Sequence, residues 1–409
     1  MRVIVIGAGI GGLALAQALP HHGIDVAVHD RDPRAEATGG YRLHIDDIAS
    51  GILRKHLPAE PYQALLAGSP SRSAQRGISF ADHKLRVLGA IRFPLEEEVL
   101  LVGRVPLRVL LTHGLDHAIR WSSEYVRHET HADGTVTAYF ADGTTDHGDV
   151  LVGADGSTSR VATALAGRPT SAPIGMGGIA GRTLLTSEIR EVLPEALLTG
   201  SVLAIGPDGG GAFLTLFDNT AGSAAEPRLS DGVFDEPSAV YWGVNFPLDR
   251  LPNAREIGNE AAVQTAVGLL RTWAPLMRTV VAAADLSTVG TFRYHAADPE
   301  AHLTPWASGT VTALGDAVHA MPPTGGRAAV TAIRDADLLA THLADAAKGR
   351  TTIPLALHEY ERGLAAYAAE AVRVSMVPIV WQKRMAKPLL GLVARAGLAI
   401  GAPIAGAFR

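Results

Sequence analysis

A glycine-rich segment near the start of the chain, GAGIGG at residues 7–12, restricts the folds that this sequence can adopt. The β-branched run before it predicts a buried strand, and the apolar residues after it predict a helix. At such a turn, Gly7 permits the tight bend, Gly9 lets a phosphate approach the backbone, and Gly12 allows close packing of the helix. The motif therefore predicts a phosphate site at the N-terminus of a helix.

The residues that follow complete a βαβ unit. A second strand is predicted at 25–30, DVAVHD, and parallel pairing of the two strands predicts a sheet with both faces covered. The strand ends in Asp30, 18 positions after Gly12. An acid that binds ribose hydroxyls is expected about 20 residues on. The glycine motif alone is weak evidence, but strand, helix and acid together indicate a dinucleotide site.

The chain has 409 residues, more than one hydrophobic core usually holds, which favours two domains packed together. Strand-like segments follow one another from 174 to 249, so we expect a largely antiparallel sheet inserted into an α/β frame. The expected boundaries are 1–170 and 285–375 for the first domain, with excursions to the sheet near 70–105, 171–284 for the sheet domain, and 376–409 for an apolar helical C-terminal segment.

Charge and composition exclude several classes of function. A net charge of −5 gives no basic field for a phosphate backbone, so nucleic acid is not expected as a partner. The absence of cysteine excludes disulfides and thiolate metal sites, and fits a cytoplasmic location. No metal-ligand spacing is found, so no metal is expected. We expect a monomer or homodimer, with the C-terminal segment packed on protein in preference to a membrane surface.

Two later segments each place an acid at the end of a predicted strand. VLVGADGSTSRVATAL, residues 150–165, has Asp155 between a strand and a helix. GDAVHAMPPTGGRAAV, residues 315–330, has Asp316 in the same position before a long predicted helix. Its paired prolines fix the loop, and its paired glycines let the backbone approach a ligand closely.

Together with GGYRLHI at 39–45 and VGRVPLRVLL at 102–111, these motifs make the chain resemble the single-component FAD-dependent monooxygenases with the para-hydroxybenzoate-hydroxylase fold, most of all actinomycete tailoring enzymes. The resemblance implies a Rossmann-like FAD-binding domain of the GR2 type, an inserted, largely antiparallel β-sheet substrate domain, and C-terminal helices. It implies an oxidoreductase in which NADPH or NADH reduces FAD. Oxygen then adds at flavin C4a, and the C4a-hydroperoxyflavin oxygenates a small hydrophobic, aromatic or polyketide-like molecule.

The resemblance also assigns an FAD site. Asp30 would hold the adenosine ribose, Arg31 would lie near the adenine, and Arg104 would reach the phosphate or ribitol region. Asp316 would bind ribitol or pyrophosphate, and Asp155 would face FAD and the nicotinamide cofactor. The full set of FAD contacts implied is Gly7, Gly9, Gly12, Asp30, Arg31, Arg42, Arg104, Asp155, Gly156, Gly315, Asp316, Pro323, Gly325 and Gly326.

The motifs do not single out a catalytic residue, because the flavin carries the chemistry and a protein base is optional. The candidates are Arg42, His44, Arg182 and His295, with His319 as a further titratable group. Substrate contacts are expected from the inserted sheet, and the candidates are Arg182, Phe213, Thr215, Trp242, Asn245 and Tyr294. About half the residues of an alternating strand point away from a cavity, so each candidate has a structural alternative.

The chain departs from the family pattern after Gly326. The family usually shows GGxGANxA, whereas this chain continues with Arg327, Ala328, Ala329 and Val330. Ala328 adds a methyl group where the backbone is expected to touch the flavin, and Val330 removes an amide side chain. Two alternatives to oxygenation therefore stay open: a cyclase or isomerase that uses FAD structurally, and a non-catalytic flavin-binding partner protein.

Overall fold

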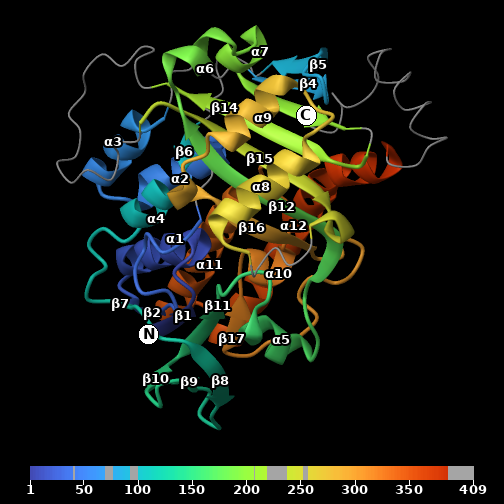
Figure 1. The fold of residues 1–409 in the computed structure, drawn as a ribbon. Helices are drawn as coiled ribbons and strands as arrows, with labels where there is room; N and C mark the ends of the chain where they lie inside the picture. The colour runs from blue at the N-terminus through green and yellow to red at the C-terminus, as the bar shows by residue number, and fades with distance from the viewer. Residues whose placement is uncertain are drawn as a thin grey trace.

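The computed structural model describes residues 1–39, 42–69, 77–92, 100–206, 208–218, 237–251 and 257–385. Within these ranges the chain forms two large sheets, one in the lower half and one in the upper half of the view (Figure 1). The chain begins in the first sheet, crosses to the second and returns twice, and its described part closes with two long helices. This path confirms the predicted α/β frame with an inserted sheet.

The first sheet is parallel and has the order β17-β11-β1-β2-β7. Its strands are β1 (Arg2–Ile6), β2 (Asp25–His29), β7 (Ile119–Arg120), β11 (Val150–Gly153) and β17 (Val311–Ala313). One face packs against α1 (Ile10–Ala18) and α11 (Ala328–Ala347). The other face is covered by an antiparallel sheet of β8 (Tyr125–Thr130), β9 (Val136–Phe140) and β10 (Thr145–Gly148). Both faces are therefore buried, which is why β1 and β11 read as continuous apolar runs.

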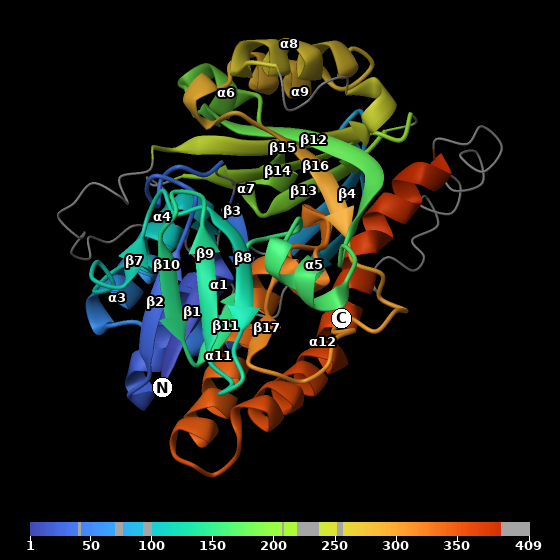
Figure 2. The same ribbon diagram turned by 90° about the horizontal axis from the view of Figure 1, so that it is seen from below.

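The second sheet has seven strands in the order β16-β12-β15-β14-β13-β4-β5. It is antiparallel except for the pair β13 and β4. Its strands are β4 (Gly77–Asp82), β5 (Val87–Arg92), β12 (Ala172–Leu184), β13 (Ser201–Ile205), β14 (Gly211–Phe217), β15 (Ala239–Pro247) and β16 (Gly290–Ala296). Helices α8 (Asn259–Leu269) and α9 (Pro275–Ala282) cover its outer face, and its inner face looks toward the first sheet (Figure 2).

One predicted boundary needs correction. The sequence assigned residues from 285 onward to the FAD-binding domain, but β16 at 290–296 is an edge strand of the seven-stranded sheet. The chain returns to the first sheet only at β17. Tertiary pairing with β12 decides this placement, and no local signal in the strand reports it.

Shorter elements connect the two sheets. A ribbon of β3 (Arg42–Ile45) and β6 (Leu100–Gly103) lies between them, flanked by helices α2 (Asp47–His56), α3 (Ala59–Ala67) and α4 (Arg104–Leu110). The remaining helices are α5 (Arg160–Ala166), α6 (Ser187–Glu191), α7 (Glu195–Leu198), α10 (Asp316–His319) and α12 (Ile353–Met385), with 3₁₀ turns at Leu19–His22, Leu248–Arg250, Leu286–Thr288 and Pro323–Gly325.

The predicted apolar C-terminal segment is partly visible as the end of α12, which continues to Met385 and contains Pro378. Residues 386–409 of that segment lie outside the described residues. By length and composition alone α12 would be long and apolar enough to cross a membrane, a test that core helices also pass. That the segment packs on protein in preference to a membrane surface stays a prediction.

A half-buried carboxylate links α2 to α11 and gives a pH dependence of stability. Oδ1 of Asp337 accepts hydrogen bonds from Nε2 of His56 and Nζ of Lys55, each at 2.7 Å. The hydrogen bond from His56, with that of Lys55 and against the effect of burial, lowers the pKa of Asp337 from 3.8 to about 2. A depressed pKa stabilises the fold above the unfolded value, and this stabilisation is lost as pH falls through the folded value.

We therefore expect the free energy of unfolding to depend less on pH, between pH about 4 and about 2, when Asp337 is replaced by Asn. Urea unfolding at several pH values measures this. The variant should be less stable than the parent near neutral pH, and the difference should close toward pH about 2. An unchanged difference over that interval would contradict the assignment.

Candidate functional site

The turn between β1 and α1 has the geometry that a pyrophosphate needs. Gly7 has a φ of 112°, and a Cβ there would overlap the carbonyl oxygen of Ala154. A Cβ at Gly12 would overlap the carbonyl oxygen of Gly7, so both positions require glycine. By contrast, a Cβ on Gly9 would meet nothing within 4 Å. The space above Gly9 is open at the N-terminus of α1, and the residues present there fit the phosphates of FAD.

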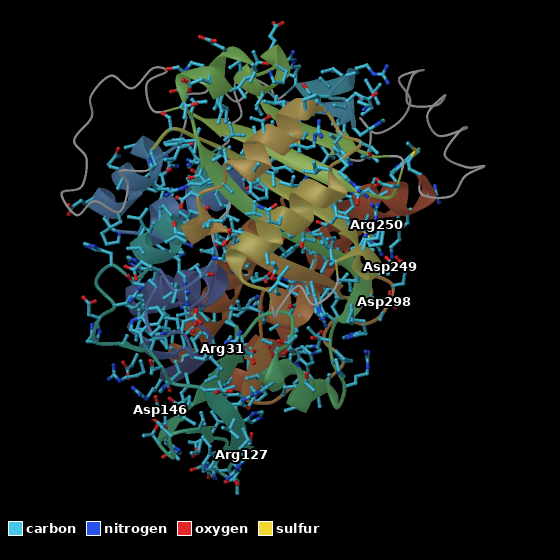
Figure 3. The ribbon with its side chains drawn as sticks, in the orientation of Figure 1. Arg31, Arg127, Asp146, Asp249, Arg250 and Asp298 are labelled. Atoms are coloured by element: carbon cyan, nitrogen blue, oxygen red, sulfur yellow. The ribbon has the colours of Figure 1, made fainter. Side chains whose placement is uncertain are left out.

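Asp30 lies beside this turn and is already held by hydrogen bonds. Its Oδ2 accepts from the backbone N–H of Ala8 at 2.6 Å and from Nη2 of Arg108 at 3.2 Å. Its Oδ1 accepts from the N–H of Asp32 at 2.7 Å. These contacts fix a carboxylate at the expected ribose position. Arg31, expected near the adenine, is exposed at the surface after β2 (Figure 3).

Arg108 is a member of this cluster that the sequence reading missed. Its side chain is only 4% exposed, and it donates to the carbonyl of Ala8 at 2.8 Å and to Oδ2 of Asp32 at 2.8 Å. The sequence spacing could have identified Arg108 as a site residue, because it follows Arg104 by four residues and the two share one face of α4. Arg108 thus reaches the adenosine end of the groove.

Asp316 begins α10 directly after β17, which lies two strands from β1 in the same parallel sheet. The preceding Gly315 has a φ of 62°, which turns the chain out of β17. Burial raises the pKa of Asp316, while the positive charges of His319 and Arg104 oppose the rise. No hydrogen bond to its carboxylate occurs within the part of the chain that the structure describes. An acceptor with this freedom suits the hydroxyls of a ribitol chain.

A buried network beneath α10 fixes that loop, and it centres on Asp335 of α11. Asp335 accepts from the N–H of Gly315 at 2.8 Å, from Nε2 of His319 at 2.6 Å and from the hydroxyl of Tyr367 at 2.6 Å. His319 and Asp335 are fully buried. Burial alone would lower the pKa of His319, but the charge and hydrogen bond of Asp335 raise it. His319 therefore supports the loop through its hydrogen bond to Asp335.

The loop after α10 brings Gly326, Arg327 and His44 together. Gly326 has a φ of 64°, and a Cβ there would stand 3.6 Å from Cβ of His44. Burial lowers the pKa of His44, the charge of Arg327 lowers it further, and Asp46 opposes both. His44 is therefore neutral at physiological pH and lies next to the expected position of the flavin.

Gly325 and Val330 both pack against the interior of the protein. A Cβ on Gly325 would overlap Oγ of Ser375, so this glycine is required by packing against α12. Val330, in the first turn of α11, is buried in the core of the FAD-binding domain, where its side chain packs with the helices. The absence of an amide at position 330 therefore alters the core, and the flavin contact expected at Gly325 stays a prediction.

Asp155 uses its carboxylate to cap α5. It accepts from Oγ of Ser159 at 2.5 Å and from the N–H of Arg160 at 2.7 Å. Burial raises its pKa, and these hydrogen bonds oppose the rise. The side chain of Asp155 is thus engaged with its own helix. Gly156, with a φ of 81°, is the residue of this pair whose backbone remains open, since a Cβ there would meet nothing within 4 Å.

Arg42 is buried between the two sheets, which corrects its assignment as a flavin contact and catalytic candidate. Its guanidinium donates to the carbonyls of Leu101, at 2.6 Å from Nη2, and of Gly68, at 2.7 Å. The guanidinium carbon lies 4.1 Å from the centre of the Phe217 ring and 5.4 Å from that of Tyr241. Arg42 therefore ties β3 to the seven-stranded sheet. Its neighbours at 40 and 41 lie outside the described residues.

The inner face of the seven-stranded sheet carries most of the predicted substrate contacts. Alternation along β14 and β15 puts Phe213, Thr215, Tyr241 and Asn245 on this face, because Leu214 and Val244 pack under α8 and α9. Phe213 is 36% exposed, and Nδ2 of Asn245 donates to Oε1 of Gln382 at 2.9 Å. Arg182, opposite Tyr241, pairs with Asp285 at 3.0 Å.

Trp242 points the other way. It is 2% exposed, its Nε1 donates to Oγ1 of Thr183 at 3.0 Å, and its ring packs in the core under α8 and α9. The prediction that Trp242 contacts the substrate is therefore wrong, and Tyr241 occupies the inner face in its place. Alternation likewise puts Tyr294 and His295, which are neighbours on β16, on opposite faces, and only Tyr294 lies against the inner face at Gly178.

The comparisons with known proteins agree on one family. An FAD binding domain family matches residues 273–375. The chain is 32% identical to the dual O-methyltransferase/FAD-dependent monooxygenase elcB of Phaeosphaeria nodorum, over 82% of this chain and 39% of that protein. It is 27% identical to 6-hydroxynicotinate 3-monooxygenase of Pseudomonas fluorescens, over 91% of this chain and 90% of that protein. The chain spans 39% to 42% of the length of the first curated relatives that it matches.

Solved structures show the same fold. A protein of Photorhabdus luminescens, described as an FAD-containing monooxygenase, superposes with a TM-score of 0.76 at 29% identity, covering 93% of this chain and 97% of its own. HpxO of Klebsiella pneumoniae, solved with FAD and uric acid, superposes with a TM-score of 0.75 at 21% identity, covering 98% of this chain and 93% of its own. The resemblance to actinomycete enzymes in particular stays a prediction.

Proposed function

The chain is a homologue of the FAD-dependent monooxygenases and carries their FAD-binding fold, and on that premise we propose that it uses FAD, oxygen and NADPH or NADH to oxygenate a small aromatic molecule. The observation that carries the proposal is the open turn at Gly9, with Asp30 and Asp316 directly after strands β2 and β17 of the same sheet. Bound FAD would accept hydride and activate oxygen.

The protein side of the proposed site positions the substrate and excludes water. The inner sheet face offers aromatic side chains to a flat ring, and Asn245 and Arg182 offer polar groups at its margins. An aromatic ring is also what the name of the 6-hydroxynicotinate relative implies for that enzyme. His44, half-buried beside Gly326 and with its pKa lowered, would accept a proton near the flavin position. A cytoplasmic location is part of the proposal.

The test begins with the purified protein and its visible spectrum. We expect bound flavin, reduction by NADPH or NADH that accelerates with an aromatic substrate, and a product that has gained one oxygen atom. A protein that stays colourless with added FAD would overturn the proposal. Bound flavin that neither nucleotide reduces, with or without substrates, would favour the structural use of FAD in a cyclase or isomerase, the alternative that Ala328 and Val330 motivate.

Two substitutions test the assignment of the sheet faces. Replacing Phe213 by Ala should raise the KM for the aromatic substrate about tenfold, because contact with a half-buried ring contributes about 1.5 kcal/mol. Replacing Trp242 by Phe should leave KM unchanged and lower the free energy of unfolding by about 1 to 3 kcal/mol, since it deletes core volume and the bond to Thr183. Steady-state kinetics and urea unfolding report the two effects. The reverse pattern would contradict the orientation of β15.

A further inference from the structure

A cavity of about 480 Å³ is lined by residues between 168 and 174, by residues between 296 and 305, and by Arg373 and Met376 of α12. Its walls are the connection between α5 and β12, the connection between β16 and β17, and the outer side of α12. Asp298, at its margin, is labelled in Figure 3. The cavity is separate from the inner face of the seven-stranded sheet, because none of the inner-face residues Phe213, Tyr241 and Asn245 lines it.

The wall of this cavity is bonded to both acid loops of the FAD groove. Oγ of Ser171 donates to the carbonyl of Ser157, beside Asp155, at 2.6 Å. Oγ1 of Thr170 donates to the carbonyl of Ala317, beside Asp316, at 2.7 Å. On the opposite wall the N–H of Ala297 donates to the carbonyl of Ala320 at 2.8 Å. Only one layer of backbone thus separates the cavity from the loops that would hold FAD.

The lining of the cavity is mostly apolar, and it carries charged side chains of both signs. Leu303, Ile174 and Met376 are among the apolar residues, and Arg168, Arg373 and Asp298 are among the charged ones. Arg373 is engaged by carboxylates, since it pairs with Glu300 at 2.8 Å and with Glu370 at 3.4 Å. Arg168 is exposed, and among the described residues no ion pair or hydrogen bond engages its guanidinium. Arg168 is therefore the lining cation that is left for a phosphate.

A further cation lies close by, since Nζ of Lys383 donates to the carbonyl of Ile174 at 2.7 Å. An apolar floor beside Arg168 suits a ligand that has a flat ring and phosphate groups. An adenine nucleotide has both, and arginine is the side chain that binds phosphate with two parallel hydrogen bonds. An uncharged aromatic substrate would gain nothing from Arg168.

The proposed reaction needs a second nucleotide site. The sequence contains one strand, glycine turn and acid combination of the dinucleotide type, and its geometry at Gly9 and Asp30 fits FAD. NADPH or NADH must therefore bind elsewhere while FAD stays in place. We propose that the cavity between α5, the β16–β17 connection and α12 binds the adenosine phosphate part of this reductant, with Arg168 as a phosphate contact. The inference rests on the proposed function, because it names the site of that reductant.

The first experiment measures reduction of the FAD-loaded protein by NADPH and NADH in a stopped-flow instrument. Replacing Arg168 by Glu should raise the apparent Kd for the nucleotide about tenfold or more, the effect of losing about 1.4 kcal/mol. The limiting reduction rate, the FAD content and the KM for the aromatic substrate should not change. Arg362→Glu, on the same helix as Arg373 but outside the cavity, is the control with the same change in charge.

A second variant fills the cavity without changing charge. Replacing Ala301, which lines the cavity, by Trp should raise the same Kd, and FAD content and thermal unfolding show whether the variant has folded. A Kd unchanged in both folded variants would overturn the proposal. A raised KM for the aromatic substrate with an unchanged nucleotide Kd would overturn it too, since the cavity would then serve substrate entry.

Direct binding separates failure of this inference from failure of the proposed function. If neither nucleotide reduces the wild-type flavin, the proposed function fails, and the cavity is tested alone with ADP by calorimetry on the FAD-loaded protein. Binding of ADP that Arg168→Glu weakens and Arg362→Glu does not would support a nucleotide site. No binding of ADP to the wild-type protein would overturn it.

Discussion

FAD is expected to leave the protein when Asp316 is replaced by Ala, with a dissociation constant raised about tenfold to a hundredfold. A charge-assisted hydrogen bond contributes about 1.5 to 3 kcal/mol, and each 1.4 kcal/mol corresponds to a factor of ten. The carboxylate stands at the groove without a hydrogen bond of its own within the described chain, so its deletion removes a ligand contact and disturbs no internal one. Quenching of flavin fluorescence on titration measures the constant.

Matched variants make the result specific. Asp316→Asn keeps the shape and loses the charge, so it should lie between the parent and the alanine variant. Asp116→Ala removes an exposed carboxylate away from the groove and should leave FAD affinity unchanged. An Asp316→Ala protein that keeps its flavin at the affinity of the parent would refute the placement of the α10 loop at the cofactor.

Replacing Asp335 by Ala is expected to lower the free energy of unfolding by about 3 to 5 kcal/mol, the cost of removing one partner from a buried ion pair. His319 would lose its counter-charge, and the N–H of Gly315 and the hydroxyl of Tyr367 would lose their acceptor. Because Gly315 precedes Asp316, FAD affinity should fall as well. Urea unfolding and flavin titration measure the two losses, and Asp345→Ala, at an exposed site of the same helix, is the control.

The pH dependence of this loss follows from the raised pKa of His319. A histidine whose folded pKa lies above its unfolded value of 6.5 stabilises the fold in full below that value, and the stabilisation is lost as pH rises through the folded pKa. The difference between the parent and Asp335→Ala should therefore shrink as pH is raised above about 6.5 and through the folded pKa of His319. A difference that grows over this range would show that His319 is neutral in the pair.

The fold could be predicted from the sequence because its signals are local. Short spacings predict the glycine turn, the acid at the end of β2 and the Gly-Asp pair at the start of α10. The alternation of the inserted strands could be predicted in the same way. Which face of a strand points inward could not be predicted, because a shift of one residue exchanges the two faces of the sheet. For this reason the sequence indicated Trp242 as a substrate contact, whereas Tyr241 lies on the inner face of the sheet.

Partners that meet from distant parts of the chain could not be predicted either. Arg108 meets Asp30 from 78 positions away, and Tyr367 meets Asp335 from 32 positions away. Arg42 and Gly325 were read from their neighbours in sequence as flavin contacts, whereas packing against Phe217 and Ser375 determines their surroundings. Local composition reports what a residue can do, and tertiary packing decides which of those roles it takes.

Helix α12 passes every part of this site in turn. Near its start Glu361 accepts from Oγ1 of Thr312 in β17, in its middle the carbonyl of Ser375 accepts from Oγ1 of Thr324, and near its end Gln382 meets Asn245 in β15. Both sheets and the loop between them are thus hydrogen-bonded to the same helix. The cofactor-binding half and the substrate-binding half should consequently melt together, and neither can be excised as an independently folding piece.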